Sequence, residues 1–249
     1  KLVHVESPTN PLLELCDIQA AGQVCKSKNV LLSVDNTFMS PYGQRPLELG
    51  ASITMQSSTK SLSGHSDILG GVLATNDEEL YEKLQFMLKA TGGVPSPFDN
   101  WITLRSTKTL ALRYQRASDN AFELAKWLSD NQNVSKTIYP GLDSHPQHEI
   151  ARKQQLSPKG DVVFGSMLSI DLGDVESRDN FLRKIEIFQL AESLGSVESL
   201  VCIPFFMTHA AVPEETKLEM GITESLVRLS IGIEDAEDLK SDLSIALEK

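Results

Sequence analysis

The feature that most constrains the fold is an alternation of short apolar segments with helix-like segments near the start of the chain. Residues 30–34, Val-Leu-Leu-Ser-Val, are almost continuously apolar, which is typical of a strand that is covered on both faces. Further strands are expected at residues 2–6, 52–56 and 70–75, with helices at residues 12–25 and 77–90, the second capped by Asn76. Strands that alternate with helices predict an α/β fold built on a mostly parallel, doubly wound sheet.

Polar clusters follow three of these predicted strands. They lie at residues 7–10, 35–37 and 57–60. In a parallel, doubly wound sheet the carboxyl ends of the strands share one edge, and ligands bind beyond that edge. The sequence therefore predicts a functional site where the three clusters meet.

The second half of the chain has a different organisation. Residues 91–97 contain Gly, Pro and Ser and break the pattern, and one long helix over residues 99–130 is expected to link two domains. Strands are then expected near residues 134–139, 165–172 and 226–233, with helices near residues 175–184 and 236–247. We therefore divide the chain into residues 1–112, part of a large domain, and residues 113–249, the linking helix and a small C-terminal α/β domain.

The composition of the chain limits the classes of partner and the kinds of structure that can be expected. Asp and Glu number 34 against 23 Lys and Arg, so the formal net charge is −11, which repels nucleic acid and anionic lipid at long range. No run of about 18 apolar residues occurs, and no membrane span is expected. Three cysteines without paired spacing favour a reducing, cytoplasmic location over a disulfide framework or a zinc site. Because the pattern predicts an interior strand from the first residues onward, the natural chain is expected to start upstream.

Lys60 and Asp35 are the candidates for chemistry. A lysine amine forms a Schiff base only when it is deprotonated. The hydroxyls of Ser57 and Thr59, just before Lys60, could donate hydrogen bonds to a phosphate. The same four-residue sequence is also typical of a plain turn that ends in a surface lysine. A carboxylate such as Asp35, at the end of an apolar strand, is costly to bury unless it is paired. A pyridinium nitrogen is one partner, and a helix cap or a turn is the alternative. The spacing from Asp35 to Lys60 leaves room for one helix and one strand, which would place both at one sheet edge.

Several motifs occur together in one order and spacing. They are Glu-Ser-Pro-Thr-Asn-Pro at residues 6–11, Val-Asp-Asn-Thr-Phe at 34–38, Ser-Ser-Thr-Lys at 57–60, Gly-His-Ser-Asp at 64–67, Ala-Glu-Ser-Leu-Gly at 191–195, Glu-Ser at 198–199, Met-Thr-His at 207–209 and Val-Arg-Leu-Ser at 227–230. With them the chain resembles the transsulfuration (Cys/Met metabolism) family of pyridoxal-phosphate (PLP) enzymes, most closely its eukaryotic cystathionine γ-lyases, without the N-terminal part. The resemblance implies PLP fold type I, the aspartate-aminotransferase-like fold, with residues 1–112 in the large PLP-binding domain.

The same resemblance implies how the cofactor is held. Lys60 would carry pyridoxal 5'-phosphate as a Schiff base and shuttle protons as the catalytic residue, while Asp35 would pair with the pyridine nitrogen. Ser57 and Thr59 would hold the phosphate, and Asn10 would lie near the ring oxygen. The set of cofactor-binding residues implied is Lys60, Asp35, Ser57, Thr59, Asn10 and Thr37.

Substrate recognition is implied in the same way. Arg228 would clamp the substrate α-carboxylate, because a guanidinium fork binds a carboxylate through two hydrogen bonds, with Ser193, Thr208 and Asn10 at that end of the pocket. Glu192 would attract the distal ammonium of cystathionine. By resemblance, this glutamate favours γ-lyases and γ-synthases over β-lyases and methionine γ-lyases.

The implied function is γ-elimination of cystathionine to cysteine, 2-oxobutanoate and ammonia, with hydrogen sulfide release from cysteine as a side activity. One alternative is cystathionine γ-synthase activity, in which cysteine replaces the γ-substituent of an O-acyl-homoserine. An alternative of another class is an inactive fragment or assembly subunit that lacks N-terminal cofactor contacts. The family also implies a homotetramer, a dimer of dimers with shared active sites.

Other residues qualify this interpretation. Ser61, Ser63 and Ser196, together with the Ser-Thr pair at residues 106–107, differ from the pattern of many family members and leave the fine substrate preference open. The two histidines at residues 145 and 148 are expected in a solvated loop rather than at a metal. His65 and His209 are expected to organise local hydrogen bonds.

Overall fold

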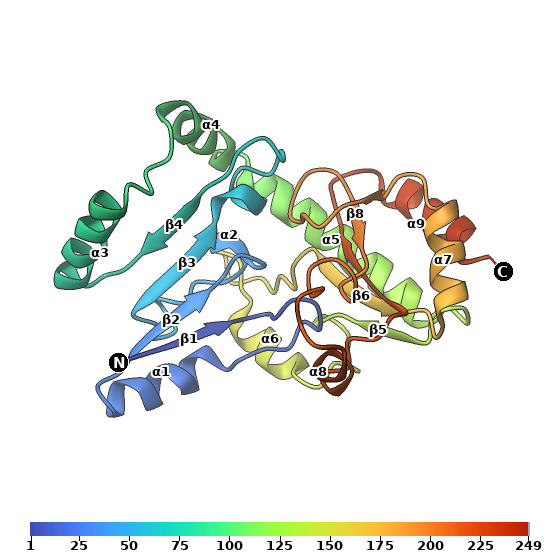
Figure 1. The fold of residues 1–249 in the computed structure, drawn as a ribbon, viewed down its shortest axis with the longest axis horizontal. Helices are drawn as coiled ribbons and strands as arrows, with labels where there is room; N and C mark the ends of the chain where they lie inside the picture. Colours follow the sequence, from blue (N-terminus) through green and yellow to red (C-terminus); the bar gives the residue numbers. More distant parts are fainter. Residues whose placement is uncertain (249) are drawn as a thin grey trace.

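The computed structural model describes residues 1–248 and contains two sheets of four and five strands. Figure 1 shows the first sheet on the left and the second on the right, with helix α5, Leu110–Ser129, starting beside the first sheet and running along the second. Among residues 1–248, no helix is both long enough and apolar enough to cross a membrane. The site described below lies where loops from the two sheets meet.

The first sheet has the strand order β1-β2-β3-β4. Its strands are β1 Leu2–Glu6, β2 Leu31–Asp35, β3 Ile53–Ser57 and β4 Gly71–Ala74. The first three pair in parallel and β4 is antiparallel to β3, so the predicted mostly parallel sheet is confirmed. Helix α1, Ile18–Ser27, covers it by packing buried Ile18 and Cys25 with Leu32 and Val34 of β2.

The helix predicted over residues 12–25 begins only at Ile18. Asp17 caps it by accepting a hydrogen bond from the amide of Ala20, as a side chain at a helix start does. Leu13, with a positive φ of 57°, is instead buried beside Phe38 in a cluster that contains residues of the second sheet. The helical spacing of the leucines was therefore misleading, because their apolar surface is buried by remote parts of the chain.

Two further predictions on the helices need correction. The cap of α3, Glu78–Thr91, is Asp77 rather than Asn76, since the Asp77 carboxylate accepts from the amide of Leu80. The single long helix predicted over residues 99–130 is two helices, α4 Pro97–Thr107 and α5. Because α4 ends at Thr107, the carbonyl oxygens of its last turn have no amide partners within the helix. Arg113 of α5 donates a hydrogen bond to one of them, the carbonyl oxygen of Ser106.

The second sheet has the order β5-β6-β9-β8-β7. Its strands are β5 Lys136–Ile138, β6 Met167–Asp171, β7 Gln189–Leu190, β8 Leu200–Cys202 and β9 Leu226–Ser230. All neighbours are antiparallel except β7 and β8. Helices α7 Val175–Lys184 and α9 Ala236–Leu247 occur at the predicted residues. The sequence reading missed β7, β8 and three short helices, α2 Ser40–Gly43, α6 His148–Gln154 and α8 Glu214–Glu219.

The main core lies between the second sheet and helices α5, α7 and α9. Leu124 and Leu128 of α5 are fully buried against Leu168 of β6, Leu229 of β9 and Leu243 of α9. A second cluster joins the two sheets by packing Leu13 and Phe38 against residues of β5, β6 and β9. The division at residues 112 and 113 remains a prediction, since α5 contacts elements on both sides of it.

Replacing a core leucine of α5 should destabilise the fold. For Leu124→Ala we expect a loss of about 2–5 kcal/mol in the free energy of unfolding, because a cavity remains in a close-packed core. Leu112→Ala, on the same helix at a position 75% exposed, should change it by less than about 0.5 kcal/mol. Urea unfolding followed by circular dichroism measures both, and equal effects would contradict the packing described here.

Candidate active site

The carboxyl ends of β1, β2 and β3 meet at one edge of the first sheet. The register pairs Glu6 with Asp35 and Asp35 with Met55, so the segments after these residues leave the sheet side by side. Buried Gln44 holds two of the segments together by donating to the carbonyl oxygen of Ser7 at 3.0 Å and to the side-chain oxygen of Asn36 at 2.8 Å. The three polar clusters therefore converge.

Lys60 lies directly after β3, in a turn of π-helix at Ser58–Leu62. Its backbone is not helical, with φ −90° and ψ −133°, and its Nζ donates a hydrogen bond to Oγ of Ser193 at 3.2 Å. Burial, followed by the positive charge of Arg228, lowers the pKa of the Lys60 amine from its ordinary value. Within residues 1–248, Lys60 forms no ion pair with a carboxylate. A larger share of the amine is thus deprotonated at neutral pH than in a surface lysine.

Asp35 lies half-buried at the end of β2. Its Oδ1 accepts a hydrogen bond from the amide of Thr37 at 2.9 Å, and Oγ1 of Thr37 accepts from the amide of Ser57 at 2.9 Å. In the described part of the chain no cation pairs with the Asp35 carboxylate. Such a carboxylate is suited to a positively charged partner from outside the chain.

Arg228 is the largest of the fully buried side chains, 1% exposed at the centre of β9. Its Nη1 donates to Oδ1 of Asn10 at 3.0 Å, and its Nη2 donates to the carbonyl oxygens of Glu192 at 2.8 Å and Ser193 at 3.0 Å. Nε is buried without a hydrogen-bond partner among residues 1–248. All of its acceptors are neutral, so a desolvated guanidinium is left to attract an anion. Burial lowers the pKa of Arg228, for the same reason.

The remaining predicted residues lie around this centre. Thr59 Oγ1 accepts from the amide of Gly70 at 3.0 Å. Thr208 Oγ1 lies 2.9 Å from Nδ1 of His209. Glu192 contacts Arg228 through its carbonyl oxygen and has an exposed side chain. Hydrogen bonds thus join the predicted residues into two groups, one around Arg228 and one around Thr37. Thr59, Thr208 and the Glu192 carboxylate belong to neither group. The first group is Lys60, Ser193, Arg228 and Asn10, and the second is Asp35, Thr37 and Ser57.

Arg113 is a site-supporting residue that the sequence reading missed. It is 8% exposed and donates to the carbonyl oxygens of Ser61 at 2.9 Å and Leu62 at 3.3 Å, which follow Lys60. It also approaches Gly64 so closely that an added Cβ there would lie 2.0 Å from the Arg113 guanidinium. Arg113 therefore holds the Lys60 turn against α5. An arginine on a helix predicts a charged surface, and no signal in the sequence indicated this role.

The expectation for the histidine pair was wrong in part. His145 is 8% exposed rather than solvated, and burial lowers its pKa. Nδ1 of His148 donates a hydrogen bond to the carbonyl oxygen of Pro140 at 2.8 Å, and the His148 ring stacks on Phe164 with ring centroids 5.4 Å apart. The described residues contain no group of three or more side chains arranged to hold a metal ion.

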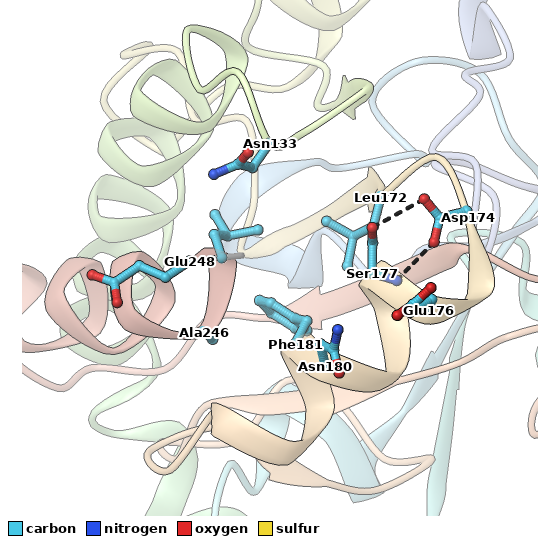
Figure 2. Close-up of a pocket in the computed structure, with 10 residues that line it drawn as sticks. Asn133, Leu172, Asp174, Glu176, Ser177, Asn180, Phe181, Ala246 and Glu248 are labelled. Carbon is cyan, nitrogen blue, oxygen red and sulfur yellow. Dashed lines mark hydrogen bonds between the residues drawn. The ribbon is translucent and has the colours of Figure 1, made fainter.

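A separate pocket of about 300 Å³ lies between α7 and the end of α9, far along the chain from Lys60. Figure 2 shows Asn133, Ser177, Asn180 and Phe181 around it, with Glu248 at its margin. None of the predicted site residues lines it. We assign it no part in the proposed chemistry, since no lysine or arginine is among its described lining residues.

The residues at the sheet edge fit pyridoxal phosphate. Asp35 is a carboxylate without a cation, Lys60 has a lowered pKa, and buried Arg228 has an unpartnered Nε and only neutral acceptors. These features match the needs of a pyridinium nitrogen, an aldehyde carbon and a substrate carboxylate respectively. Ser57 and Thr59 lie at the strand end where a phosphate would enter.

The chain was compared with known proteins and solved structures. Residues 1–248 match the family model described as "Cys/Met metabolism PLP-dependent enzyme". The chain is 52% identical to the cystathionine gamma-lyase of Dictyostelium discoideum, over all of this chain and 63% of that protein. It is 45% identical to the cystathionine beta-lyase of Lactococcus lactis subsp. cremoris, over all of this chain and 64% of that protein. It therefore spans somewhat less than two thirds of these relatives.

Solved structures of cystathionine enzymes have the same fold as this chain. The cystathionine gamma synthase of Xanthomonas oryzae pv. oryzae in complex with cystathionine matches with a TM-score of 0.94 at 42% identity, covering 99% of this chain and 62% of that one. The cystathionine gamma-lyase of Lactobacillus plantarum complexed with L-serine also has a TM-score of 0.94, at 39% identity, covering 99% of this chain and 63% of that one. The predicted family and fold type are both confirmed. The chain belongs to the Cys/Met metabolism family of PLP-dependent enzymes.

Proposed function

We propose that the protein carrying this chain catalyses γ-elimination of cystathionine, giving cysteine, 2-oxobutanoate and ammonia. The observation that carries the proposal is the half-buried Lys60 amine, hydrogen-bonded to Ser193, whose carbonyl oxygen in turn accepts from Arg228. One site thus combines a proton-transferring amine with a receptor for a carboxylate. The gamma-lyases among the relatives support the same reaction.

Six residues would hold the cofactor in this proposal. When bound, pyridoxal phosphate supplies an electron-withdrawing ring that stabilises negative charge next to the substrate amino group. Asp35 favours the protonated ring nitrogen, and Thr37 fixes the orientation of the Asp35 carboxylate through its amide. The residues are Lys60, Asp35, Thr37, Ser57, Thr59 and Asn10.

Lys60 acts as the base and acid of the reaction. Its lowered pKa makes the neutral amine available to accept a proton from the substrate α-carbon and to return it at a later atom. The Ser193 hydroxyl, 3.2 Å from Nζ, keeps the amine directed toward the arginine side of the site. Because one amine performs successive proton transfers, the rate of the reaction depends on where Nζ of Lys60 is held relative to the substrate atoms.

Arg228 binds the α-carboxylate of the amino-acid substrate. Asn10 and the two carbonyl oxygens of the 192–193 segment hold the guanidinium at a fixed angle, which reduces the ordering needed on binding. Its buried charge forms no ion pair with a carboxylate within the described chain. A carboxylate ligand is therefore the partner that best satisfies it.

Glu192 would select the distal end of the substrate. Its exposed carboxylate, next to Ser193 in the chain, can attract the second ammonium group of cystathionine. The relatives include both gamma- and beta-lyases, so we propose both the preference for cystathionine and cleavage on its γ side on the basis of Glu192.

A γ-replacement reaction is the second candidate, favoured by the similarity to the Xanthomonas cystathionine gamma synthase. It would use the same cofactor and Arg228 and join cysteine to an O-acyl-homoserine. Rates with cystathionine alone and with O-acyl-homoserine plus cysteine separate the two reactions. Faster turnover of the second pair would replace the lyase proposal.

We further propose a cytoplasmic homotetramer, a dimer of dimers that shares its active sites. Helices α3 and α4 support association, because α3 has no buried residue and both expose large apolar side chains. These are Phe86, Met87, Phe98, Trp101 and Leu104. Exposed apolar surface of this kind is typical of protein interfaces.

The chain by itself should bind the cofactor weakly. It spans 63% of the length of its Dictyostelium relative, and by the family pattern the missing portion supplies further ring and phosphate contacts. Titrating the isolated 249 residues with pyridoxal phosphate, followed by absorbance, measures this. Tight binding of one cofactor per chain would contradict the prediction.

Lys60→Ala should abolish both covalent attachment of the cofactor and elimination activity. Among the described residues, the two hydrogen-bonded groups of the site contain no lysine other than Lys60, so borohydride treatment followed by peptide mass analysis should find the cofactor on Lys60 of the wild type and nowhere in the variant. Lys26→Ala, an exposed lysine in the last turn of α1, should leave trapping unchanged. Trapped cofactor in Lys60→Ala would remove Lys60 from its proposed role.

Arg228→Lys should raise KM for cystathionine by about 10- to 100-fold, because a single ammonium cannot replace the two-pronged guanidinium at a carboxylate. Borohydride trapping on Lys60 should persist, which distinguishes lost substrate binding from misfolding. An unchanged KM in a folded, cofactor-loaded variant would show that the carboxylate binds elsewhere.

A further inference from the structure

The segment at residues 192–198 touches both halves of the site. At its start, the carbonyl oxygens of Glu192 and Ser193 accept from Arg228, and Oγ of Ser193 accepts from Lys60. Next, the amide of Gly195 donates to Oγ of Ser230 at 2.8 Å. The segment therefore lies between the lysine turn of the first sheet and the arginine strand of the second.

The same segment is fastened to the chain just after Lys60. Both Oγ of Ser196, at 3.0 Å, and the amide of Val197, at 2.9 Å, donate to the carbonyl oxygen of Gly64. On its other side, the carbonyl oxygen of Val197 accepts from the amide of Ile233 at 2.9 Å. A short stretch thus connects the two sheets through backbone and side-chain hydrogen bonds.

Ser66 and Glu198 complete this connection. The Ser66 hydroxyl lies 2.6 Å from Oε1 of Glu198 and 3.0 Å from Oγ of Ser196. Burial acts to raise the pKa of Glu198, but the hydroxyls of Ser66 and Ser196, a backbone amide hydrogen bond and the nearby His65 together lower that pKa below its ordinary value. Charge-assisted hydrogen bonds of this kind are stronger than neutral ones.

Gly195 brings the segment into contact with the lysine turn. Its φ is +75°, and an added Cβ would lie 3.0 Å from the amide nitrogen of Ser61 and 3.4 Å from Cβ of Lys60. The segment packs directly on the backbone that carries the Lys60 side chain. A shift of the segment would consequently move Ser193 relative to the Lys60 amine.

We propose that Ser66, Ser196 and Glu198 form a clasp between the two sheets that positions Lys60 relative to Ser193 and Arg228. The described hydrogen bonds of Ser66, Ser196 and Glu198 do not reach Lys60, Ser193 or Arg228 directly, so the three act as positioning residues. The kinetic consequence rests on the function proposed above. The structural consequence, a fixed contact between residues 60–66 and 193–198, does not.

The test uses the full-length, cofactor-loaded enzyme. Ser196→Ala removes the hydroxyl and keeps Cβ, and Glu198→Ala removes the acceptor of Ser66. Each should lower kcat for cystathionine by about tenfold with KM changing less than about threefold, because misplacing a proton-transferring group affects the chemical step more than binding. Glu198→Gln keeps an oxygen that can accept from Ser66 and should restore kcat to within about threefold of the wild type.

Hydrogen exchange supplies an arm that does not depend on activity. Ser196→Ala should speed exchange of the amides in residues 193–198, including that of Val197, by about tenfold or more. Ser27→Ala serves as the matched control, since this exposed serine also donates to a nearby carbonyl but lies on α1. It should leave exchange and kcat at their wild-type values.

The outcomes separate the two proposals. Faster exchange together with lower kcat supports the clasp, whereas unchanged exchange overturns it. Faster exchange with unchanged kcat in an active enzyme overturns the positioning role. If the wild type does not turn over cystathionine, the proposed function fails, and the exchange arm then decides whether the clasp exists.

Discussion

The parallel pairing of β1, β2 and β3 is the constraint on which the rest of the structure depends. Backbone hydrogen bonds in register place Glu6 beside Asp35 and Asp35 beside Met55, so three chain segments leave the sheet at one edge. Because of this pairing, Asp35 and the turn that carries Lys60 lie at the same edge of the sheet. The buried amide nitrogen of Gln44 then fixes the segments by donating to the carbonyl oxygen of Ser7 and to the side-chain oxygen of Asn36.

Two positively charged side chains, Lys60 and Arg228, are held near each other, and neither forms an ion pair with a carboxylate among the described residues. Burial and, after it, the charge of the desolvated Arg228 lower the pKa of Lys60, while Asn10 and two carbonyl oxygens hold the Arg228 guanidinium in place. A site of this kind stores unfavourable electrostatic energy that an anionic ligand relieves. The same arrangement thus explains both how an amino-acid carboxylate would be recognised and how a lysine would be kept ready to move protons.

Support for the Lys60 turn comes from parts of the chain that are distant in sequence. Arg113 holds the turn against α5 through carbonyl oxygens, and the segment at residues 192–198 holds it against the second sheet. In each of these contacts a side chain donates a hydrogen bond to a backbone carbonyl oxygen near Lys60. Such contacts specify position well, since a backbone carbonyl has a fixed place once its turn has formed.

The sequence by itself determined the alternating α/β pattern, the edge of the sheet where the site lies, and the residues Asp35 and Lys60 at strand ends. These follow from local apolar runs and from the way parallel strands align, both of which are periodic and short in range. Only the tertiary structure decided that α1 starts at Ile18, that Arg113 supports the lysine turn and that Arg228 contacts Asn10. Each of these depends on burial against residues far along the chain, and local sequence spacing carries no record of such contacts.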